Sequence, residues 1–179
     1  DAIFFNTYVE RIADLKKIGG NGDFLCFKCS SLGSLEKVGG YVNLLNSLVE
    51  NLGELQFVGA DFIGCDTLLK SLNKLKVIGR NARLESRNLL NLGDLEYVGR
   101  DLFLDGSNVK SLDKLEHVGG DVHLFNSKVK SLGKLEFVGG NLDIRDTKLR
   151  NLGNLKFVGG EILMSTWQKI LFAKQIEVK

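Results

Sequence analysis

The side chains best suited to acid–base chemistry in this sequence are His123 and two aspartates, Asp105 and Asp143. An imidazole next to a carboxylate can pass a proton to or from a substrate. Nothing else in the sequence supports catalysis, because we find neither a cluster of metal ligands nor a nucleophile motif. We therefore predict a protein that is not an enzyme and that uses no cofactor and no metal.

A Cys-x-x-Cys pair, Cys26 and Cys29, is the second candidate for chemistry. Such a pair binds zinc or exchanges disulfides when a second ligand pair or a redox fold accompanies it. Here Cys65 stands alone, and three cysteines are too few for a disulfide framework. The repeat described next puts Cys29 at an inward position and Cys26 at a corner, so we interpret them as core and corner residues.

All of these residues belong to a twenty-residue repeat that runs without insertion or deletion from about Phe5 to about Gly160. The similarity is plain between residues 120–137 (GDVHLFNSKVKSLGKLEF) and 140–157 (GNLDIRDTKLRNLGNLKF). A fixed period of this length is typical of a solenoid, in which each coil buries its apolar face only against its neighbours. We predict about nine coils, with function in the residues that vary between them.

Coil positions are numbered here from 1 to 20, starting at residues 1, 21, 41 and so on. Positions 2 and 4 are apolar, as at Val122 and Leu124, which predicts a short strand with one inward face. Positions 9, 12, 15 and 18 are also apolar, and their spacing favours 3₁₀-like or irregular turns. The predicted fold class is an all-β-leaning solenoid, with a parallel sheet on one face and irregular or 3₁₀ segments on the others.

Coil positions 6, 13 and 19 have the composition of corners. They hold mainly Gly, Asn and Asp, and position 19 is glycine in every coil from Gly19 to Gly159. These residue types tolerate a positive φ most easily. Three corners in each coil predict a roughly three-sided cross-section.

The repeat pattern ends near Ser165, which divides the chain into a solenoid (1–164) and a C-terminal cap (165–179). Ser165–Gln168 has the pattern of a capping box, and we predict a helix over residues 166–175. Its apolar stripe would be Trp167, Ile170 and Leu171, with the stem of Lys174. The alternative is a ninth coil, in which Val178 would lie in the core. Because the chain begins at Asp1 rather than Met, already in register, we expect a processed protein or part of a longer one.

The coil resembles leucine-rich repeats of the short, twenty-residue type. The pattern V-x-L-x-x-S-x-V-x-x-L at 122–132 matches the core pattern of that family, L-x-L-x-x-N-x-L. The pattern L-x-x-L-x-x-V-G-x-x-L-x-I at 132–144 is similar to the L domains of growth-factor receptors, with one extra residue after the glycine. The resemblance implies a non-enzymatic recognition scaffold for protein partners. Hydroxyl residues replace the ladder asparagine of the family and must satisfy the inner turn: Ser47, Thr67, Ser107, Ser127 and Thr147.

The outward strand positions, 3 and 5, are the natural binding face of this architecture, and they are not repetitive. In the later coils they are Arg83, Glu85, Phe103, Asp105, His123, Phe125, Asp143 and Arg145. Aromatic residues beside Arg, Asp and His on a rigid sheet are typical of a protein-binding hot spot. The alternative is a solvated face with incidental pairs, which should not expose two phenylalanines side by side.

The same positions of the earlier coils are mostly apolar. They include Ile3, Phe5, Leu25, Leu45, Ile63 and Cys65, which form a second interface or lie beneath residues that precede the chain. Gly64 stands where a core residue is expected, so a local bulge could turn Ile63 inward.

Three further sets of residues are open to a structural or a functional interpretation. Position 17 carries an aromatic series, which we interpret as a spine covering the core; a stripe that binds glycans or a partner is the alternative.

Arg80 and Arg100 could bind an anion, unless Asp61, Asp101 and Asp121 neutralise them. Two lysine ladders alternate with glutamates, which favours a solvated outer face. The ladders are Lys70, Lys110, Lys130 and Arg150, and Lys74, Lys114 and Lys134.

Composition excludes two classes of partner. The net charge is +2 with acids and bases interspersed, which argues against a nucleic-acid partner. No apolar run approaches the length of a membrane span, so we expect no membrane insertion. The resemblance to L domains favours a secreted or cell-surface location, whereas the lack of flanking cysteine modules and of Asn-x-Ser/Thr sites opposes it.

We therefore predict a scaffold that binds a protein partner through the outward strand face centred on Phe103, His123 and Phe125. One alternative is a carbohydrate-binding or carbohydrate-processing β-helix that uses the same face, with His123 and an aspartate as the acid–base pair. Another is a structural spacer module within a longer chain.

Overall fold

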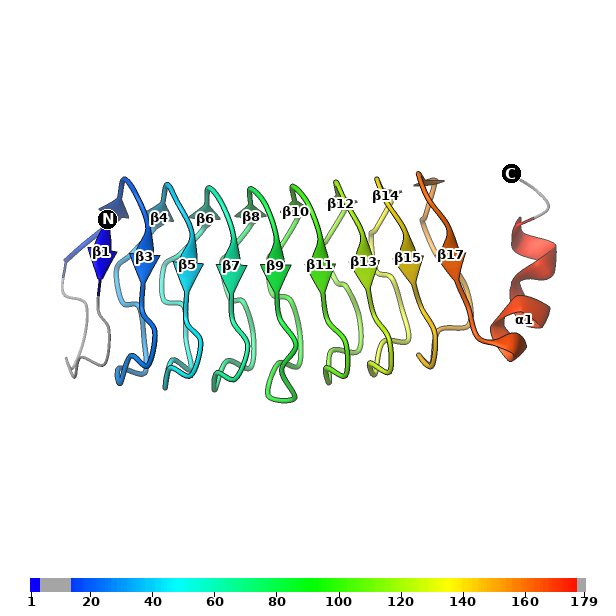
Figure 1. Ribbon diagram of the computed structural model, residues 1–179, viewed down its shortest axis with the longest axis horizontal. Helices are drawn as coiled ribbons and strands as arrows, with labels where there is room; N and C mark the ends of the chain where they lie inside the picture. Colours follow the sequence, from blue (N-terminus) through cyan, green and yellow to red (C-terminus); the bar gives the residue numbers. More distant parts are fainter. Residues whose placement is uncertain (4–13, 177–179) are drawn as a thin grey trace.

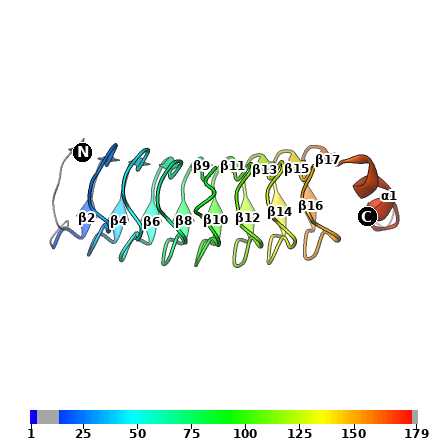
Figure 2. The ribbon, with the colours of Figure 1, turned by 90° about the horizontal axis from the view of Figure 1, so that it is seen from below.

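The computed structural model describes residues 1–3 and 14–176, with side chains described as far as 173, and it is a parallel β-solenoid (Figure 1). About eight coils follow one another along a single axis, and one helix lies at the C-terminal end. Viewed from below, the strands form two rows on different sides of the same rod (Figure 2).

The predicted parallel sheet is present at coil positions 2 and 3, and its nine strands follow the order of the chain. Leu102 pairs with Val122 and Phe103 with His123, so each residue lies beside its equivalent in the next coil. This first sheet consists of β1 (Ala2–Ile3), β3 (Gly22–Asp23), β5 (Val42–Asn43), β7 (Phe62–Ile63), β9 (Ala82–Arg83), β11 (Leu102–Phe103), β13 (Val122–His123), β15 (Leu142–Asp143) and β17 (Ile162–Leu163).

A second parallel sheet lies at positions 17 and 18, where we had expected only turns. In each middle coil the first residue faces outward and the second is buried, as at His117 and Val118. The apolar positions on this side, 15 and 18, are three residues apart, so they do not show the period-two pattern that positions 2 and 4 show for the first sheet. This second sheet consists of β2 (Lys17–Ile18), β4 (Lys37–Val38), β6 (Phe57–Val58), β8 (Val77–Ile78), β10 (Tyr97–Val98), β12 (His117–Val118), β14 (Phe137–Val138) and β16 (Phe157–Val158).

The positions predicted to face inward form one continuous core. In the coil that begins at residue 101 they are Leu102, Leu104, Val109, Leu112 and Leu115, all of which are fully buried. Burying each of these side chains contributes about 1.5–3 kcal/mol relative to exposure. The core therefore runs along the rod, and each coil depends on its two neighbours.

Two of the three predicted corners have the expected backbone. Asn126 at position 6 has a φ of 54°, and Gly133 at position 13 has a φ of 59°. Position 19 differs, because no described glycine there has a positive φ. A Cβ atom on Gly119 would instead collide with the carbonyl oxygen of Gly99 in the preceding coil. Close approach of neighbouring backbones is what requires glycine at this position.

An unpredicted side-chain ladder runs along coil position 1. The backbone N–H of Asn81 donates to Oδ1 of Asp61 at 3.0 Å, and that of Asp101 donates to Oδ1 of Asn81 at 3.2 Å. The same contact repeats at Asp121 and Asn141. The hydroxyls of position 7, which we expected to satisfy the inner turn, are buried but only partly paired. Those of Thr67 and Thr147 donate to the carbonyls of Gly64 and Ile144. The Oγ atoms of Ser47, Ser107 and Ser127 have no partner among the described residues.

The bulge considered at Gly64 is absent. β7 keeps its register with β9, and Ile63 remains partly exposed. The ring of Phe62 fills the missing volume, since a Cβ on Gly64 would lie 2.8 Å from Phe62 Cε1. Among the other early outward residues Ile3 is exposed, whereas Phe5 lies outside the described residues.

Helix α1 (Thr166–Ile176) begins at the predicted capping box. The backbone N–H and the hydroxyl of Ser165 both donate to Oε1 of Gln168, at 3.0 and 2.8 Å. The helix excludes a further β-coil over these residues, although Val178 itself lies outside the described part of the chain.

The buried face of α1 is not the predicted one. Trp167, Ile170 and Leu171 are exposed, whereas Gln168 and Phe172 are fully buried. The side chain of Lys174 is outside the described set. Gln168 satisfies the end of the inner turn, because its Nε2 donates to the carbonyl of Ile144 at 2.9 Å and to the hydroxyl of Thr147 at 3.1 Å.

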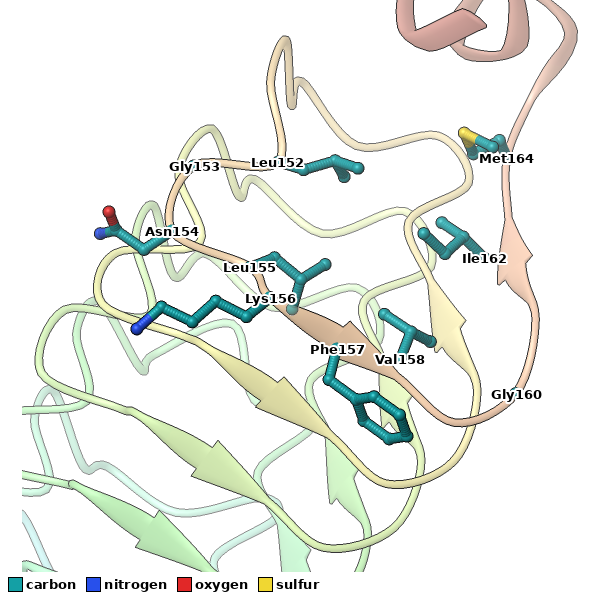
Figure 3. A pocket seen from close by; sticks show the side chains of 10 residues that line it. All are labelled: Leu152, Gly153, Asn154, Leu155, Lys156, Phe157, Val158, Gly160, Ile162 and Met164. Carbon is teal, nitrogen blue, oxygen red and sulfur yellow. The ribbon is translucent and has the colours of Figure 1, made fainter. Parts of the chain in front are cut away.

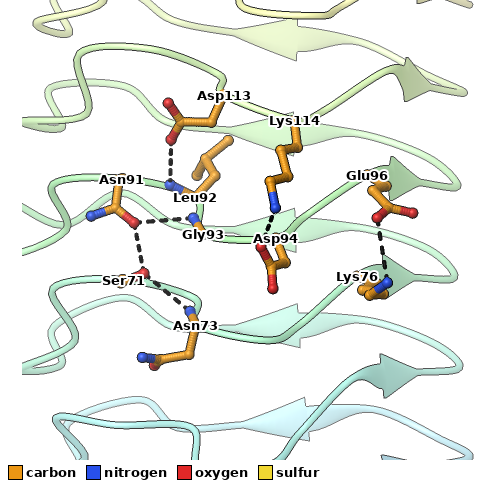
Figure 4. Close-up of polar contacts among 10 residues, drawn as sticks. All are labelled: Ser71, Asn73, Lys76, Asn91, Leu92, Gly93, Asp94, Glu96, Asp113 and Lys114. Atoms are coloured by element: carbon orange, nitrogen blue, oxygen red, sulfur yellow. Dashed lines mark hydrogen bonds and ion pairs between the residues drawn. The ribbon is translucent and has the colours of Figure 1, made fainter.

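Lysines and acids at coil positions 14 and 16 form ion pairs between neighbouring coils (Figure 4). Lys114 Nζ lies 2.7 Å from Asp94 Oδ1, and Lys76 Nζ lies 3.6 Å from Glu96 Oε1. Exposed pairs of this kind contribute about 0–1 kcal/mol each. The ladder that contains Lys74 and Lys114 therefore lies on the solvated face that the alternating charges indicated. The ladder at position 10 lies on another side and makes no ion pair among the described residues.

Candidate functional site

The eight candidate residues lie together on the outer face of the first sheet, in the coils of β9, β11, β13 and β15. Their strand neighbours Ala82, Leu102, Val122 and Leu142 are fully buried, which directs the position 3 side chains outward. The in-register pairing places equivalent residues of adjacent coils about 4.8 Å apart. Residues separated by twenty in the sequence are therefore in direct contact.

At position 3 the side chains form a stack. The guanidinium carbon of Arg83 lies 4.9 Å from the centroid of the Phe103 ring. On the other side of that ring, His123 is stacked at 4.6 Å with an angle of 6° between the planes. Both faces of Phe103 are therefore covered, and the stack presents ring edges to the solvent.

At position 5 the side chain of Arg145 is held by an ion pair with Asp143, at position 3 of the same coil. Arg145 donates to both carboxylate oxygens of Asp143, at 2.9 Å from Nε and 2.6 Å from Nη2. Its guanidinium also lies 5.5 Å from the centroid of the Phe125 ring. Burial alone would raise the pKa of Asp143, but the hydrogen bonds and charge of Arg145 outweigh it and hold the pKa below its ordinary value. Phe125 is 43% exposed and is the most accessible aromatic side chain of this site.

The acidic part of the site is formed by Glu85 and Asp105. Burial raises the pKa of Asp105, although a hydrogen bond from the backbone of Phe125 and the charge of His123 oppose this effect. Glu85 Oε2 accepts a hydrogen bond from Cys65 Sγ at 3.2 Å. Burial, together with this bond and the charge of Glu85, raises the pKa of Cys65 to about 12. Cys65 is therefore a protonated thiol at neutral pH.

We expect Cys65 to react slowly with iodoacetamide at pH 8, at least about tenfold slower than in the unfolded chain, because only the thiolate is nucleophilic. Glu85→Gln removes the negative charge beside the thiol and should lower its pKa and raise the rate. Peptide mass spectrometry of the alkylated protein measures the rate at each cysteine separately. An equal rate at Cys65 in the parent and in the variant would contradict the contact.

The other two cysteines match the structural interpretation. Cys29 is buried in the core, and its Sγ contacts the carbonyl oxygen of Ser31 at 3.3 Å. Cys26 occupies a corner with a φ of 54°. No group of three or more His, Cys, Asp or Glu side chains within the described ranges is arranged to hold a metal ion.

The acid–base pairs considered for His123 are not assembled. The carboxylate of Asp143 is occupied by Arg145, and the imidazole of His123 lies flat on Phe103. No hydrogen bond joins His123 to Asp105 or Asp143 in the part of the chain that the structure describes.

The aromatic series at position 17 forms a second stack, on the second sheet. Successive rings lie 4.4–4.9 Å apart and nearly parallel along Tyr97, His117, Phe137 and Phe157. Their inward neighbours at position 18 complete the core, so the stack covers it from outside as a spine would. The inner rings, His117 and Phe137, have both faces covered and offer none to a sugar ring, whereas the end rings, Tyr97 and Phe157, are exposed.

The arginines at the corner make no ion pair. Arg80 and Arg100 are exposed, and neither contacts a carboxylate among the described residues. Asp61, Asp101 and Asp121 accept backbone hydrogen bonds in the position 1 ladder. These aspartates therefore connect neighbouring coils, and no contact among the described residues shows them neutralising the arginines.

An apolar cleft of about 820 Å³ lies at the C-terminal end of the core (Figure 3). Leu152, Leu155, Val158, Ile162 and Met164 line it, together with the exposed Phe157. In a middle coil the equivalent residues are covered by the next coil, whereas at this end α1 covers only part of them. The sequence repeat could have indicated this cleft, because the last coil has the same inward residues as the others but is followed by a helix instead of another coil.

No protein-family model, curated protein or solved structure matches this chain. Within the described ranges, no helix has the length and apolarity needed to cross a membrane. The inference of function therefore depends on the solenoid and on the contacts of its surface.

Proposed function

We propose that the chain is a non-enzymatic recognition scaffold that binds a protein partner through the outer face of the first sheet, between β9 and β15. The observation that carries this proposal is the stack of Arg83, Phe103 and His123 beside the exposed ring of Phe125. Arginine and aromatic side chains at the centre of a rigid surface are typical of residues that dominate protein–protein affinity.

The site is pre-ordered, which supports a binding role. Its larger side chains already contact one another, so less conformational entropy is lost when a partner binds. Positive groups (Arg83 and Arg145) and acidic groups (Glu85 and Asp105) are both present, which suits a partner surface of mixed charge. The resemblance of the repeat to leucine-rich repeats and receptor L domains also supports recognition of proteins.

Carbohydrate binding on the same face has less support. Sugar rings stack on open aromatic faces, and Phe103 has none because Arg83 and His123 cover it. One face of Phe125 is likewise covered by Arg145.

A quantitative capture experiment from the lysate and medium of the source cells tests the proposal. The baits are the parent chain, a site variant with Arg83→Ala, Phe103→Ala and Phe125→Ala, and a matched control with Tyr97→Ala and Phe137→Ala on the second sheet. We expect a protein captured by the parent and by the control but not by the site variant. With that purified protein, Phe125→Ala alone should weaken binding by about 2 kcal/mol, roughly 30-fold.

Two outcomes would contradict the proposal. Equal capture by all three baits would mean that the partner does not bind to this face of the first sheet. Binding to a glycan array that Phe125→Ala abolishes, without any captured protein, would establish the carbohydrate alternative.

A further inference from the structure

A strongly basic face lies on the side of the solenoid that neither sheet covers. Between coil positions 7 and 12 of the last three full coils (residues 107–112, 127–132 and 147–152) there are five cations and no acid. The whole chain has a net charge of only +2, so the positive charge is concentrated here. We call this group the basic face: Lys110, Lys128, Lys130, Lys148 and Arg150, all of them exposed.

The basic face is rigid and its cations are unpaired. The backbone N–H of Lys130 donates to the carbonyl of Lys110 at 2.9 Å, and that of Lys148 donates to the carbonyl of Val129 at 3.0 Å. Val109, Val129 and Leu149 are buried between the cationic positions, which directs the lysines outward. Within the described ranges no ion pair involves a residue of the basic face, whereas five ion pairs use the lysines of positions 14 and 16.

At its C-terminal end the basic face contains a cleft with an aromatic wall. The cleft has a volume of about 770 Å³ and is lined by Lys130, Thr147, Lys148, Arg150, Asn151 and Trp167. Trp167 is 45% exposed, because α1 buries Gln168 and Phe172 in its place. The unexpected orientation of the helix is therefore what puts an indole beside three cations.

We propose that the basic face binds a linear acidic polysaccharide, a chain of pyranose units that carry carboxylate or sulfate groups. The cations recur once per coil along a straight line. A linear ligand whose anionic groups are spaced about as far apart as neighbouring coils can contact several of these cations at once. The indole of Trp167 offers a surface for one sugar ring, and its cation neighbours bind the acidic group.

The neutral residues of this face favour a sugar over a nucleic acid. Asn108, Ser111, Ser131 and Asn151 lie between or beside the cations. Asn108 Nδ2 already donates to a backbone carbonyl, and the other three accept from backbone N–H groups. The serine hydroxyl protons and the amide N–H groups of Asn151 can still donate to sugar hydroxyl groups. Single-stranded nucleic acids are held by successive aromatic platforms for their bases. On the basic face Trp167 is the one aromatic side chain among the described residues.

Titration calorimetry with polygalacturonate and with a heparin-type sulfated chain tests the proposal, and the two arms distinguish carboxylate from sulfate. The face variant is Lys130→Gln, Lys148→Gln and Arg150→Gln, and the matched control is Lys76→Gln, Lys114→Gln and Lys156→Gln. Both remove three positive charges. We expect saturable binding of at least one chain that the face variant weakens by about tenfold or more. The control should stay within about twofold of the parent.

Further readouts separate a sugar site from simple attraction between charges. Trp167→Ala should weaken binding without changing its dependence on salt, whereas the face variant should reduce that dependence. Neutral dextran should not bind. The proposal is overturned by equal losses in the face variant and the control, by the absence of saturable binding to either chain, or by tighter binding of single-stranded DNA than of both polysaccharides. The partner proposed for the first sheet is unaffected by any of these results.

Discussion

Replacing Gly119 with alanine is expected to lower the free energy of unfolding by about 2–3 kcal/mol. The added Cβ would overlap the carbonyl oxygen of Gly99 in the preceding coil. Because that atom belongs to the backbone, no side-chain rotation can relieve the overlap, and the two coils must move apart. Both adjacent sheets would then lose part of their hydrogen-bond register. Urea unfolding followed by circular dichroism measures the change.

Gly106→Asn is the matched control for this substitution. Gly106 has a φ of 65°, and a Cβ there would meet no atom within 4 Å. Asparagine already occupies the equivalent corner in the next coil, at Asn126 with a φ of 54°. We expect a change smaller than about 0.5 kcal/mol. If Gly119→Ala proved equally mild, close backbone approach would not be the reason for glycine at position 19.

The features of the fold that could be predicted from the sequence are those that repeat. The twenty-residue period, the inward positions and the corners at positions 6 and 13 recur in almost every coil, so each is observed many times. The second sheet could not be recognised, because its apolar positions, 15 and 18, are three residues apart and do not alternate as positions 2 and 4 do. The ladder at position 1 was missed for a different reason. Asp61, Asn81 and Asp101 are residue types that usually face solvent. Only the stacking of the coils shows that each side chain accepts a hydrogen bond from the backbone of the next coil.

For the candidate site, the sequence could predict on which face the side chains lie but not which of them contact one another. Alternation in the strand correctly placed Phe103, His123 and Asp143 on the outer face. It could not show that Asp143 is nearly buried beneath Arg145, since that contact depends on the length and the conformation of the arginine side chain. The buried face of the helix was predicted wrongly for a similar reason. Apolar residues surround much of α1, so the sequence does not distinguish Phe172 as the buried one.

Removing α1, by ending the chain at residue 164, is expected to increase concentration-dependent self-association relative to the parent chain. Phe172 is fully buried against the last coil, and losing a buried phenylalanine costs about 3–5 kcal/mol locally. The carbonyl of Ile144 would also lose its bond from Gln168. The truncated end would present an apolar surface and unpaired strand groups, which associate readily with a second copy. Sedimentation velocity at several protein concentrations measures the association.

Two variants that retain α1 show which surface is responsible. Ile170→Glu with Leu171→Glu changes exposed residues of the helix and should not increase self-association above that of the parent, because the cap remains in place. Gln168→Ala with Phe172→Ala removes the contacts of the cap and should reproduce part of the association. It should also speed amide hydrogen exchange in β15 and β17 before the middle coils, since terminal coils of a solenoid can open locally. A truncated chain that associates no more than the parent, with unchanged exchange, would mean that the apolar cleft at the end of the core is stable without a cap. The helix would then serve chiefly to hold Trp167 beside the basic face.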